Sequence, residues 1–252
     1  MKITWFGTAS IAIESGKDKI LFDPFVPMEG SPVDVRISDF KGYDHVFVTH
    51  GHVDHISSIP EIAAENTKVY CTKTPKATLT ALGVPEDNIS EITAGNTITI
   101  GNIRITPYQG KHIDFDNSLV LHTYLRSFTH QQKQALKLRK ALDDYPENGE
   151  ILAYLIKAEG KRVLLMGSLG MDENTVYPGD IDLMILPFQG RSELTEPAMD
   201  ILVKVKPKAV FLDHFDDTFP PVSQQVDTSE IEKTLEGVIP VTVPEHKKVY
   251  EF

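Results

Sequence analysis

The chain has 252 residues, which suits one large domain or two small ones, and 41% of them are hydrophobic, as in an ordinary globular core. Its formal net charge of −11 argues against a nucleic-acid partner, because phosphate contacts need clustered lysine and arginine. A single cysteine excludes a disulfide framework. No run approaches the roughly 18 apolar residues of a membrane span, and the N-terminus lacks the apolar stretch of a signal peptide, so we expect a cytoplasmic protein without a membrane partner.

The first half of the chain is expected to be rich in strands. Short apolar or alternating runs bounded by glycine or polar turns predict strands at 2–6, 10–14, 19–23, 45–49 and 68–72. Thr74 and Pro75 predict the start of a helix, with proline at its first position, and Gly83 predicts its end. Strands at 97–100 and 103–108, joined through Gly101 and Asn102, predict a hairpin.

The second half repeats this pattern. Apolar runs predict strands at 118–125, 151–158, 162–166, 182–187 and 209–214, with a helix at 197–205 before the last of them. Ser229 and Glu232 have the spacing of a capping box, which opens a helix that Gly237 ends.

Residues 126–149 interrupt the alternation of strands and are interpreted as a helical insertion. Ala135, Leu138 and Leu142 lie at helical spacing and are accompanied by several basic residues. Three roles stay open for this insertion, namely a lid, a contact in a homo-oligomer, or a decoration of the fold.

The most informative segment is Thr49-His-Gly-His-Val-Asp-His55, which follows the predicted strand at 45–49. His50 and His52 are two residues apart, so both can face the same ion, while Asp54 and His55 can reach a second ion. The chain has nine histidines, and three of them within one window of six residues exceed a chance arrangement. Nitrogen and carboxylate ligands suit Zn²⁺ best, with Mn²⁺ or Fe²⁺ as alternatives. The segment therefore predicts a metal site.

Further candidate residues stand at the ends of other predicted strands. His112 follows the strand at 103–108, and His214 ends the strand at 209–214, so both are candidate ligands. Metal-bound imidazoles normally donate their second N–H to a carboxylate or a carbonyl. Asp23, at a strand end before Pro24, is the first choice for such an acceptor, and capping of a turn is the alternative.

With these motifs in place, the chain resembles a metallo-β-lactamase-superfamily hydrolase across nearly its whole length. The resemblance rests on residues 1–7, 20–25 and 214–220, on the H-x-H-x-D-H signature and on His112. It is closest to the intracellular branch of metal-dependent hydrolases that includes L-ascorbate-6-phosphate lactonase. The resemblance implies an α/β fold, an αββα sandwich of two internally similar halves, in a single domain that spans residues 1–252.

The resemblance also implies a set of ligands. By this resemblance, the first metal ion would be bound by His50, His52 and His112. The second would be bound by Asp54, His55 and His214, with Asp54 as the catalytic carboxylate. The family usually bridges the two ions with an aspartate, and Ser168 stands at the matching position here. A hydroxyl is a poorer ligand than a carboxylate and adds no negative charge, so the second site is expected to be weak or empty.

The implied activity is that of a metal-dependent hydrolase, which uses a metal-bound hydroxide on a small ester, lactone or amide. Two alternatives stay open: a phosphodiesterase on the same dinuclear site, and a catalytically weak member that binds metal or ligand, as Ser168 would favour. The expected partner is a small molecule. Lys111 and Arg191 are candidates for binding an anionic group of the substrate, and ordinary surface charge is the alternative for both.

Overall fold

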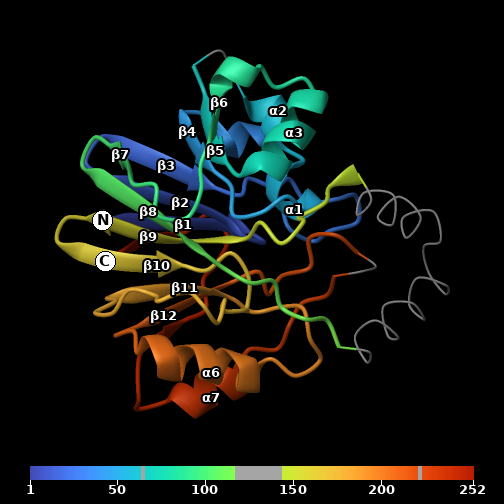
Figure 1. The fold of residues 1–252 in the computed structure, drawn as a ribbon. Coiled ribbons are helices and arrows are strands. Elements are labelled where there is room, and N and C mark those ends of the chain that lie inside the picture. The colour runs from blue at the N-terminus through green and yellow to red at the C-terminus, as the bar shows by residue number, and fades with distance from the viewer. Residues whose placement is uncertain (64–65, 117–143, 221–222) are drawn as a thin grey trace.

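The computed structural model describes residues 1–63, 66–116, 144–220 and 223–252. It contains two seven-stranded sheets that face each other, with helices on the outer side of each sheet (Figure 1). The first sheet has the order β14-β1-β2-β3-β4-β5-β6, and the second has the order β13-β12-β11-β10-β9-β8-β7. The αββα architecture expected from the sequence is therefore confirmed.

The strand bounds follow the apolar runs of the sequence. The first sheet consists of β1 (Lys2–Gly7), β2 (Ser10–Ser15), β3 (Asp18–Phe22), β4 (His45–Phe47), β5 (Lys68–Cys71), β6 (Ile89–Glu91) and β14 (Val249–Glu251). The second consists of β7 (Ile98–Ile100), β8 (Ile103–Gln109), β9 (Leu152–Ala158), β10 (Lys161–Leu165), β11 (Leu183–Pro187), β12 (Val210–Asp213) and β13 (Val241–Thr242).

The two sheets share one pairing pattern, which makes the halves of the molecule internally similar. In the first sheet, the pairings from β14 to β3 are antiparallel and those from β3 to β6 are parallel. In the second sheet, the pairings from β7 to β10 are antiparallel and those from β10 to β13 are parallel. Under this correspondence β3 matches β10, and β4 matches β11.

Alternation along the strands divides the apolar side chains between two cores. In β2, Ile11 and Ile13 belong to the cluster that joins both sheets, whereas Ala12 belongs to the cluster beneath the helices of the first sheet. Phe22 and Tyr154 meet across the sheets, with ring centroids 5.3 Å apart. Such alternation places one face of each strand in the central core, as expected for packed sheets.

Helices cover the outer faces of both sheets (Figure 1). The first sheet carries α1 (Val53–Ile56), α2 (Ile59–Ile62) and α3 (Lys73–Ala81), and the second carries α6 (Thr195–Val205) and α7 (Ser229–Leu235). Two short 3₁₀ helices are η1 (Ile37–Phe40) and η2 (Glu86–Asn88). Within the four described ranges, no helix combines the length and the apolar character needed to cross a membrane.

Most predicted elements are confirmed, and two predicted helix starts are wrong. Helix α3 begins at Lys73, so Pro75 is its third residue rather than its first. Helix α7 begins with Ser229 itself, whose backbone N–H donates to Asp227 Oδ1 (2.9 Å) because that aspartate forms its own turn ahead of the helix. The predicted capping box is therefore absent, and Glu232 instead accepts from the Thr228 hydroxyl (2.6 Å).

Two predictions fall partly or wholly outside the described residues. The strand expected at 118–125 lies entirely there, and so does the insertion expected at 126–149, apart from residues 144–149. The strands β6, β13 and β14 were not predicted. They are two or three residues long and lie at sheet edges, where the sequence carries too short an apolar pattern to identify a strand.

Candidate metal centre

The predicted site residues follow strands whose carboxyl ends point the same way. Asp23 follows β3, and His50 follows β4, which is parallel to β3. In the second sheet, β8 and β10 are both antiparallel to β9, so β8 runs in the same direction as β10 and β12. His112 and His214, which follow β8 and β12, therefore leave the second sheet at the same edge, where open α/β sheets place their ligand sites.

Three of the histidines form one donor group, called here the three-histidine group: His50, His52 and His112. Each offers a ring nitrogen, and these nitrogens all lie within 4.8 Å of one another. His50 Nε2 lies 3.1 Å from His52 Nδ1. His112 Nδ1 lies 2.8 Å from the carbonyl oxygen of Ile113, which can only accept a hydrogen bond, so Nδ1 carries the proton. Nε2 is then left with the lone pair that can bind a metal ion.

The second donor group, called here the Asp54 group, consists of Asp54, His55 and His214. Its ligand atoms also lie within 4.8 Å of one another. Asp54 Oδ2 is 3.0 Å from His214 Nε2 and 3.6 Å from His55 Nε2. Asp54 and His55 share the single turn of α1, while His214 arrives from the other sheet, so the group joins the two halves of the molecule.

Asp23 lies where the sequence predicted an acceptor for an imidazole. Its Oδ2 is 2.9 Å from His55 Nδ1, and its Oδ1 accepts the backbone N–H of Thr49 (2.8 Å). The Thr49 hydroxyl donates to Asp23 Oδ2 (2.6 Å), so its oxygen remains to accept from His50 Nδ1 at 3.0 Å. The fully buried Asp23 thus orients two imidazoles, His55 directly and His50 through Thr49.

Gln189 orients His214, and sequence reasoning missed it. Its Oε1 lies 2.8 Å from His214 Nδ1, which leaves His214 Nε2 to face Asp54. Gln189 follows β11, the strand beside β12. The signal that marks Gln189 in the sequence is its place at the end of a predicted strand, and it lies two residues before Arg191.

The turn between β1 and β2 holds the backbone of His214, a contact that the sequence does not predict. His214 has φ +61°, a left-handed conformation that a non-glycine residue adopts only where its surroundings enforce it. Its N–H donates to the Thr8 carbonyl (2.8 Å), and the Thr8 N–H donates to Asp216 Oδ1 (2.9 Å). Asp216 also pairs with His246 (2.8 Å), which stacks on Trp5. His246 therefore helps to hold Asp216, which in turn holds the turn that binds the His214 backbone.

Burial keeps the three-histidine group uncharged. It lowers the pKa of His50 well below the ordinary value for histidine, and neighbouring imidazoles lower it further. The pKa of His52 is lowered to about 4, mainly by burial, with the opposing charge of Asp54 only partly offsetting it. The pKa of His112 is lowered by burial as well. All three rings are consequently neutral at pH 7, as a metal ligand must be.

The Asp54 group is charged in the metal-free protein. Burial acts to raise the pKa of Asp54, but His55, His214 and His52 outweigh it and hold that pKa below its ordinary value. Burial also acts to lower the pKa of His214, but the hydrogen bond and charge of Asp54, with Asp213 and Asp216, raise it to about 9. At pH 7 His214 is therefore an imidazolium paired with the Asp54 carboxylate.

The remaining predicted residues lie at the margin of this cluster. Ser168 is buried, and its hydroxyl oxygen accepts the N–H of Ile113 (3.0 Å). Lys111 Nζ lies 3.2 Å from Asp114 Oδ2, and Arg191 Nε lies 3.9 Å from an Asp116 carboxylate oxygen. The side chains of both cations are substantially exposed. Each is thus paired with a neighbouring acidic residue.

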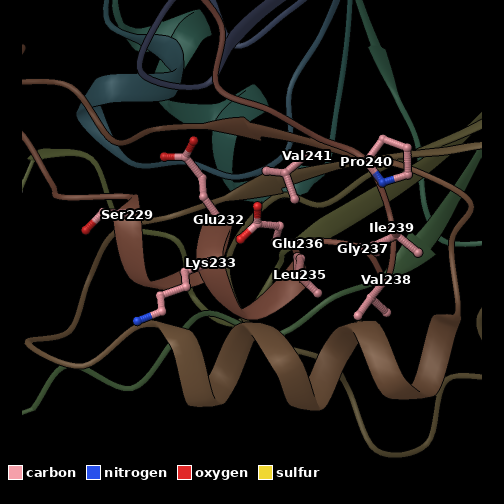
Figure 2. A pocket seen from close by; sticks show the side chains of 10 residues that line it. All are labelled: Ser229, Glu232, Lys233, Leu235, Glu236, Gly237, Val238, Ile239, Pro240 and Val241. Atoms are coloured by element: carbon pink, nitrogen blue, oxygen red, sulfur yellow. The ribbon is translucent and has the colours of Figure 1, made fainter.

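A hollow on the molecular surface lies elsewhere. Figure 2 shows it between α7 and the segment that leads into β13, with Leu235, Val238 and Pro240 among the residues that line it. None of the residues that line it belongs to either donor group or to the residues that orient them. The chemistry of the chain is concentrated at the strand ends and not in this hollow.

The donor set fits divalent metal ions. In the three-histidine group, His50 Nε2 and His52 Nδ1 lie 3.1 Å apart on uncharged rings, so both nitrogens could direct a lone pair to a cation bound between them. In the Asp54 group, a carboxylate and two imidazoles converge. Mixed nitrogen and carboxylate donors are those that Zn²⁺, Mn²⁺ and Fe²⁺ accept in proteins.

Comparison with known proteins agrees with this geometry. Residues 18–215 match the family model described as "Beta-lactamase superfamily domain". A metal-dependent hydrolase of Alkaliphilus metalliredigens is 26% identical over 243 residues, covering 92% of this chain and 95% of that protein. Another from Methanopyrus kandleri is 25% identical, with both chains fully covered. Igni18, a metallo hydrolase of Ignicoccus hospitalis, superimposes with a TM-score of 0.65 at 20% identity, covering 100% of this chain and 98% of its own.

The family match covers far more than half of the chain, and it includes both donor groups. The full-length relatives are described as metal-dependent hydrolases. The chain therefore belongs to the metallo-β-lactamase superfamily and is a metal-dependent hydrolase.

Proposed function

We propose that this hydrolase cleaves a small ester, lactone or amide at a centre of two divalent ions, with Zn²⁺ as the first choice and Mn²⁺ or Fe²⁺ as alternatives. His50, His52 and His112 would hold one ion, and Asp54, His55 and His214 the other. The observation that carries the proposal is the presence of two complete donor groups, each with its ligand atoms within 4.8 Å of one another. The resemblance to the branch that includes L-ascorbate-6-phosphate lactonase favours a lactone among these substrates.

Divalent ions bound in the two groups would supply Lewis acidity, lowering the pKa of a bound water toward about 7 and polarising the oxygen of the scissile bond. The residues of the chain set the conditions for that chemistry. Asp54 is the one carboxylate among the six donors, and its Oδ2 faces His214 at 3.0 Å. It is placed to orient the attacking water and to pass a proton to the leaving group.

Ser168, in place of a bridging aspartate, would leave the centre more positive. With one carboxylate against two divalent ions, the first shell would carry a net charge of about +3, one unit more than with a bridging aspartate. Higher positive charge acidifies a bound water further but weakens metal affinity. Of the two ions, we expect the one in the Asp54 group to bind more weakly, because His214 must first lose its proton.

The side-chain cations near the site do not single out an anionic substrate. Cations could add to the metal ions in binding a phosphodiester or another anion, and the two candidates in the sequence are Lys111 and Arg191. Both already lie against carboxylates, at 3.2 Å and 3.9 Å. A neutral ester, lactone or amide would need neither cation, so their pairing is consistent with a carbonyl substrate.

The test is a panel of generic ester, lactone, amide and bis-aryl phosphate probes, applied to protein purified without a chelator or an affinity tag of histidines. We expect hydrolysis of a carbonyl probe that depends on added Zn²⁺ and is absent in His52→Ala. His45→Ala is the matched control, since His45 lies at the start of β4, away from both donor groups. Hydrolysis of the phosphate probe alone would establish the phosphodiesterase alternative. Silence on every probe by fully metallated protein would favour the binding role.

A further inference from the structure

The turn that follows β10, residues 166–170, lies against both segments that carry the three-histidine group. A side chain built on Gly167 would come within 2.8 Å of Thr49 Cβ and 2.3 Å of the Leu152 carbonyl oxygen. One built on Gly170 would come within 2.5 Å of the Lys111 carbonyl oxygen and 3.1 Å of the His112 carbonyl oxygen. Only glycine permits these two close contacts, so the turn can pack between Thr49, at the start of the metal-binding motif, and the His112 segment.

Ser168 stands between the two glycines and makes a specific hydrogen bond. Its hydroxyl oxygen accepts the backbone N–H of Ile113 at 3.0 Å, and the whole residue is only 6% exposed. The carbonyl oxygen of the same Ile113 accepts from His112 Nδ1 at 2.8 Å. Both polar groups of the Ile113 backbone are thereby engaged, one by Ser168 and one by the imidazole.

This chain of contacts determines which nitrogen of His112 is available. The Ile113 carbonyl can only accept, so it fixes the proton on Nδ1 and leaves the Nε2 lone pair for the donor group. The orientation of that carbonyl depends on the Ile113 backbone, which Ser168 holds from the other side. The hydroxyl thus acts on His112 through one intervening residue.

We propose that Ser168 is a positioning residue for His112 and not a substitute ligand at the bridging position. This inference rests on the proposed metal centre. It gives a role to Ser168, which stands where the family usually has a bridging aspartate. The three-histidine group is complete without Ser168, because its nitrogens already lie within 4.8 Å of one another. The serine preorganises this group by holding the His112 segment, and the glycines on either side bring the turn close enough for it to do so.

The experiment compares Ser168→Ala and Ser168→Thr with Ser15→Ala as the matched control. Ser15 is also buried and hydrogen-bonded, to Glu159, but it lies at the end of β2 and is not part of the centre. Two quantities are measured: the exchange rate of the Ile113 amide in metal-free protein, and the affinity for Co²⁺ in the tighter of the two binding steps, followed by calorimetry and visible absorption. Both report on the site without requiring turnover.

For Ser168→Ala we expect amide exchange at Ile113 to accelerate about tenfold, the effect of losing one hydrogen bond, and Co²⁺ affinity to fall about tenfold, as for other residues that orient metal ligands. Threonine keeps the hydroxyl and should restore both, while Ser15→Ala should change neither. Unchanged affinity in Ser168→Ala would overturn the inference, whatever the amide does. A loss of affinity with unchanged Ile113 exchange would also overturn it, because Ser168 would then act on the ion directly.

Failure of the inference is distinguishable from failure of the proposed function. If the unmodified protein binds no Co²⁺, the metal centre itself is wrong, and His52→Ala will give the same null result. If the unmodified protein binds Co²⁺ and His52→Ala does not, the centre stands. The behaviour of Ser168→Ala then decides the positioning role alone.

Discussion

The two donor groups occupy the same edge of the molecule but differ in charge and in construction. The three-histidine group is built from buried, neutral imidazoles, whose pKa values lie below the ordinary value for histidine. The Asp54 group pairs a carboxylate with His214, whose pKa is raised to about 9. The first group is therefore ready for an ion at neutral pH, whereas the second must release a proton to accept one.

The origin of this difference lies in where the residues come from. His50 and His52 are two residues apart, and burial decides their pKa values, although the charge of Asp54 partly offsets its effect on His52. His214 reaches Asp54 from 160 residues away and meets a carboxylate at 3.0 Å. Two sites with similar ligand counts thus acquire opposite responses to pH.

Removing one ligand of the three-histidine group should have the largest effect. In His52→Ala we expect the tighter metal-binding step to weaken by more than the ~10–100-fold typical of orienting residues, because a direct ligand is lost. Hydrolysis should be abolished. Elemental analysis and turnover are the measurements, with His45→Ala as the control. Normal turnover by His52→Ala would mean that the chemistry lies elsewhere.

Asp54→Asn should come next, because it removes the one carboxylate within the two donor groups of the described residues while preserving the shape of the side chain. Turnover is expected to fall by ~10²–10⁴-fold, the range for loss of a group that handles protons. In metal-free protein the pKa of His214 should fall from about 9, since Asp54 is the leading cause of its elevation. Titration by NMR would measure this shift, and an unmoved His214 would break the contrast between the groups.

Gln189→Ala should have a smaller effect, confined to the Asp54 group. It removes the acceptor at 2.8 Å from His214 Nδ1, so the ring loses its fixed orientation. We expect the weaker metal-binding step to lose about tenfold in affinity and the tighter step to stay unchanged. Equal losses of affinity in both steps, measured by calorimetry, would show that Gln189 supports both donor groups and not His214 alone.

The smallest effect concerns the stability of the metal-free protein against pH. The folded-state pKa of His214 lies above the unfolded value, so its contribution is complete below about pH 6.5 and is lost as pH rises through about 9. The folded-state pKa of His52 is about 4, so its contribution is present above about pH 6.5 and is lost as pH falls through about 4.

The combined contribution of these two groups should therefore be greatest near pH 6.5, with each limb sloping by at most about 1.4 kcal/mol per pH unit for each proton. Thermal unfolding between pH 4 and pH 9 measures this profile. His214→Gln should flatten the alkaline limb and leave the acid limb in place. An alkaline limb that survives this substitution would assign it to other groups.

Local patterns made most of the centre predictable from the sequence. His50, His52, Asp54 and His55 lie within six residues, and their spacing alone brings them together. Asp23 was identified from its place at a strand end, and the structure gives it a hydrogen bond to His55. The strands themselves were identified because their apolar runs are bounded by turns.

What escaped prediction depends on contacts between distant segments. The contact of Thr8 with Asp216 spans 208 residues, and no local signal marks either residue as support for His214. The protonation of His214 follows from Asp54, and the hydrogen bond of Ser168 follows from the approach of Ile113. A family pattern assigns Ser168 a position, but only the packed structure shows what its hydroxyl touches.

The most direct test of the two-group account is calorimetric titration of metal-free protein with Zn²⁺ at pH 7.5, in buffers of different ionisation enthalpy. The account predicts two ions per chain in two steps. The tighter step should release no proton from its three histidines, and the weaker step should release one from His214, each in addition to any proton that a metal-bound water loses. The ring signals of His214, followed by NMR in the same titration, identify its proton. A single binding step, or a His214 ring that is already neutral before the weaker step, would contradict the account.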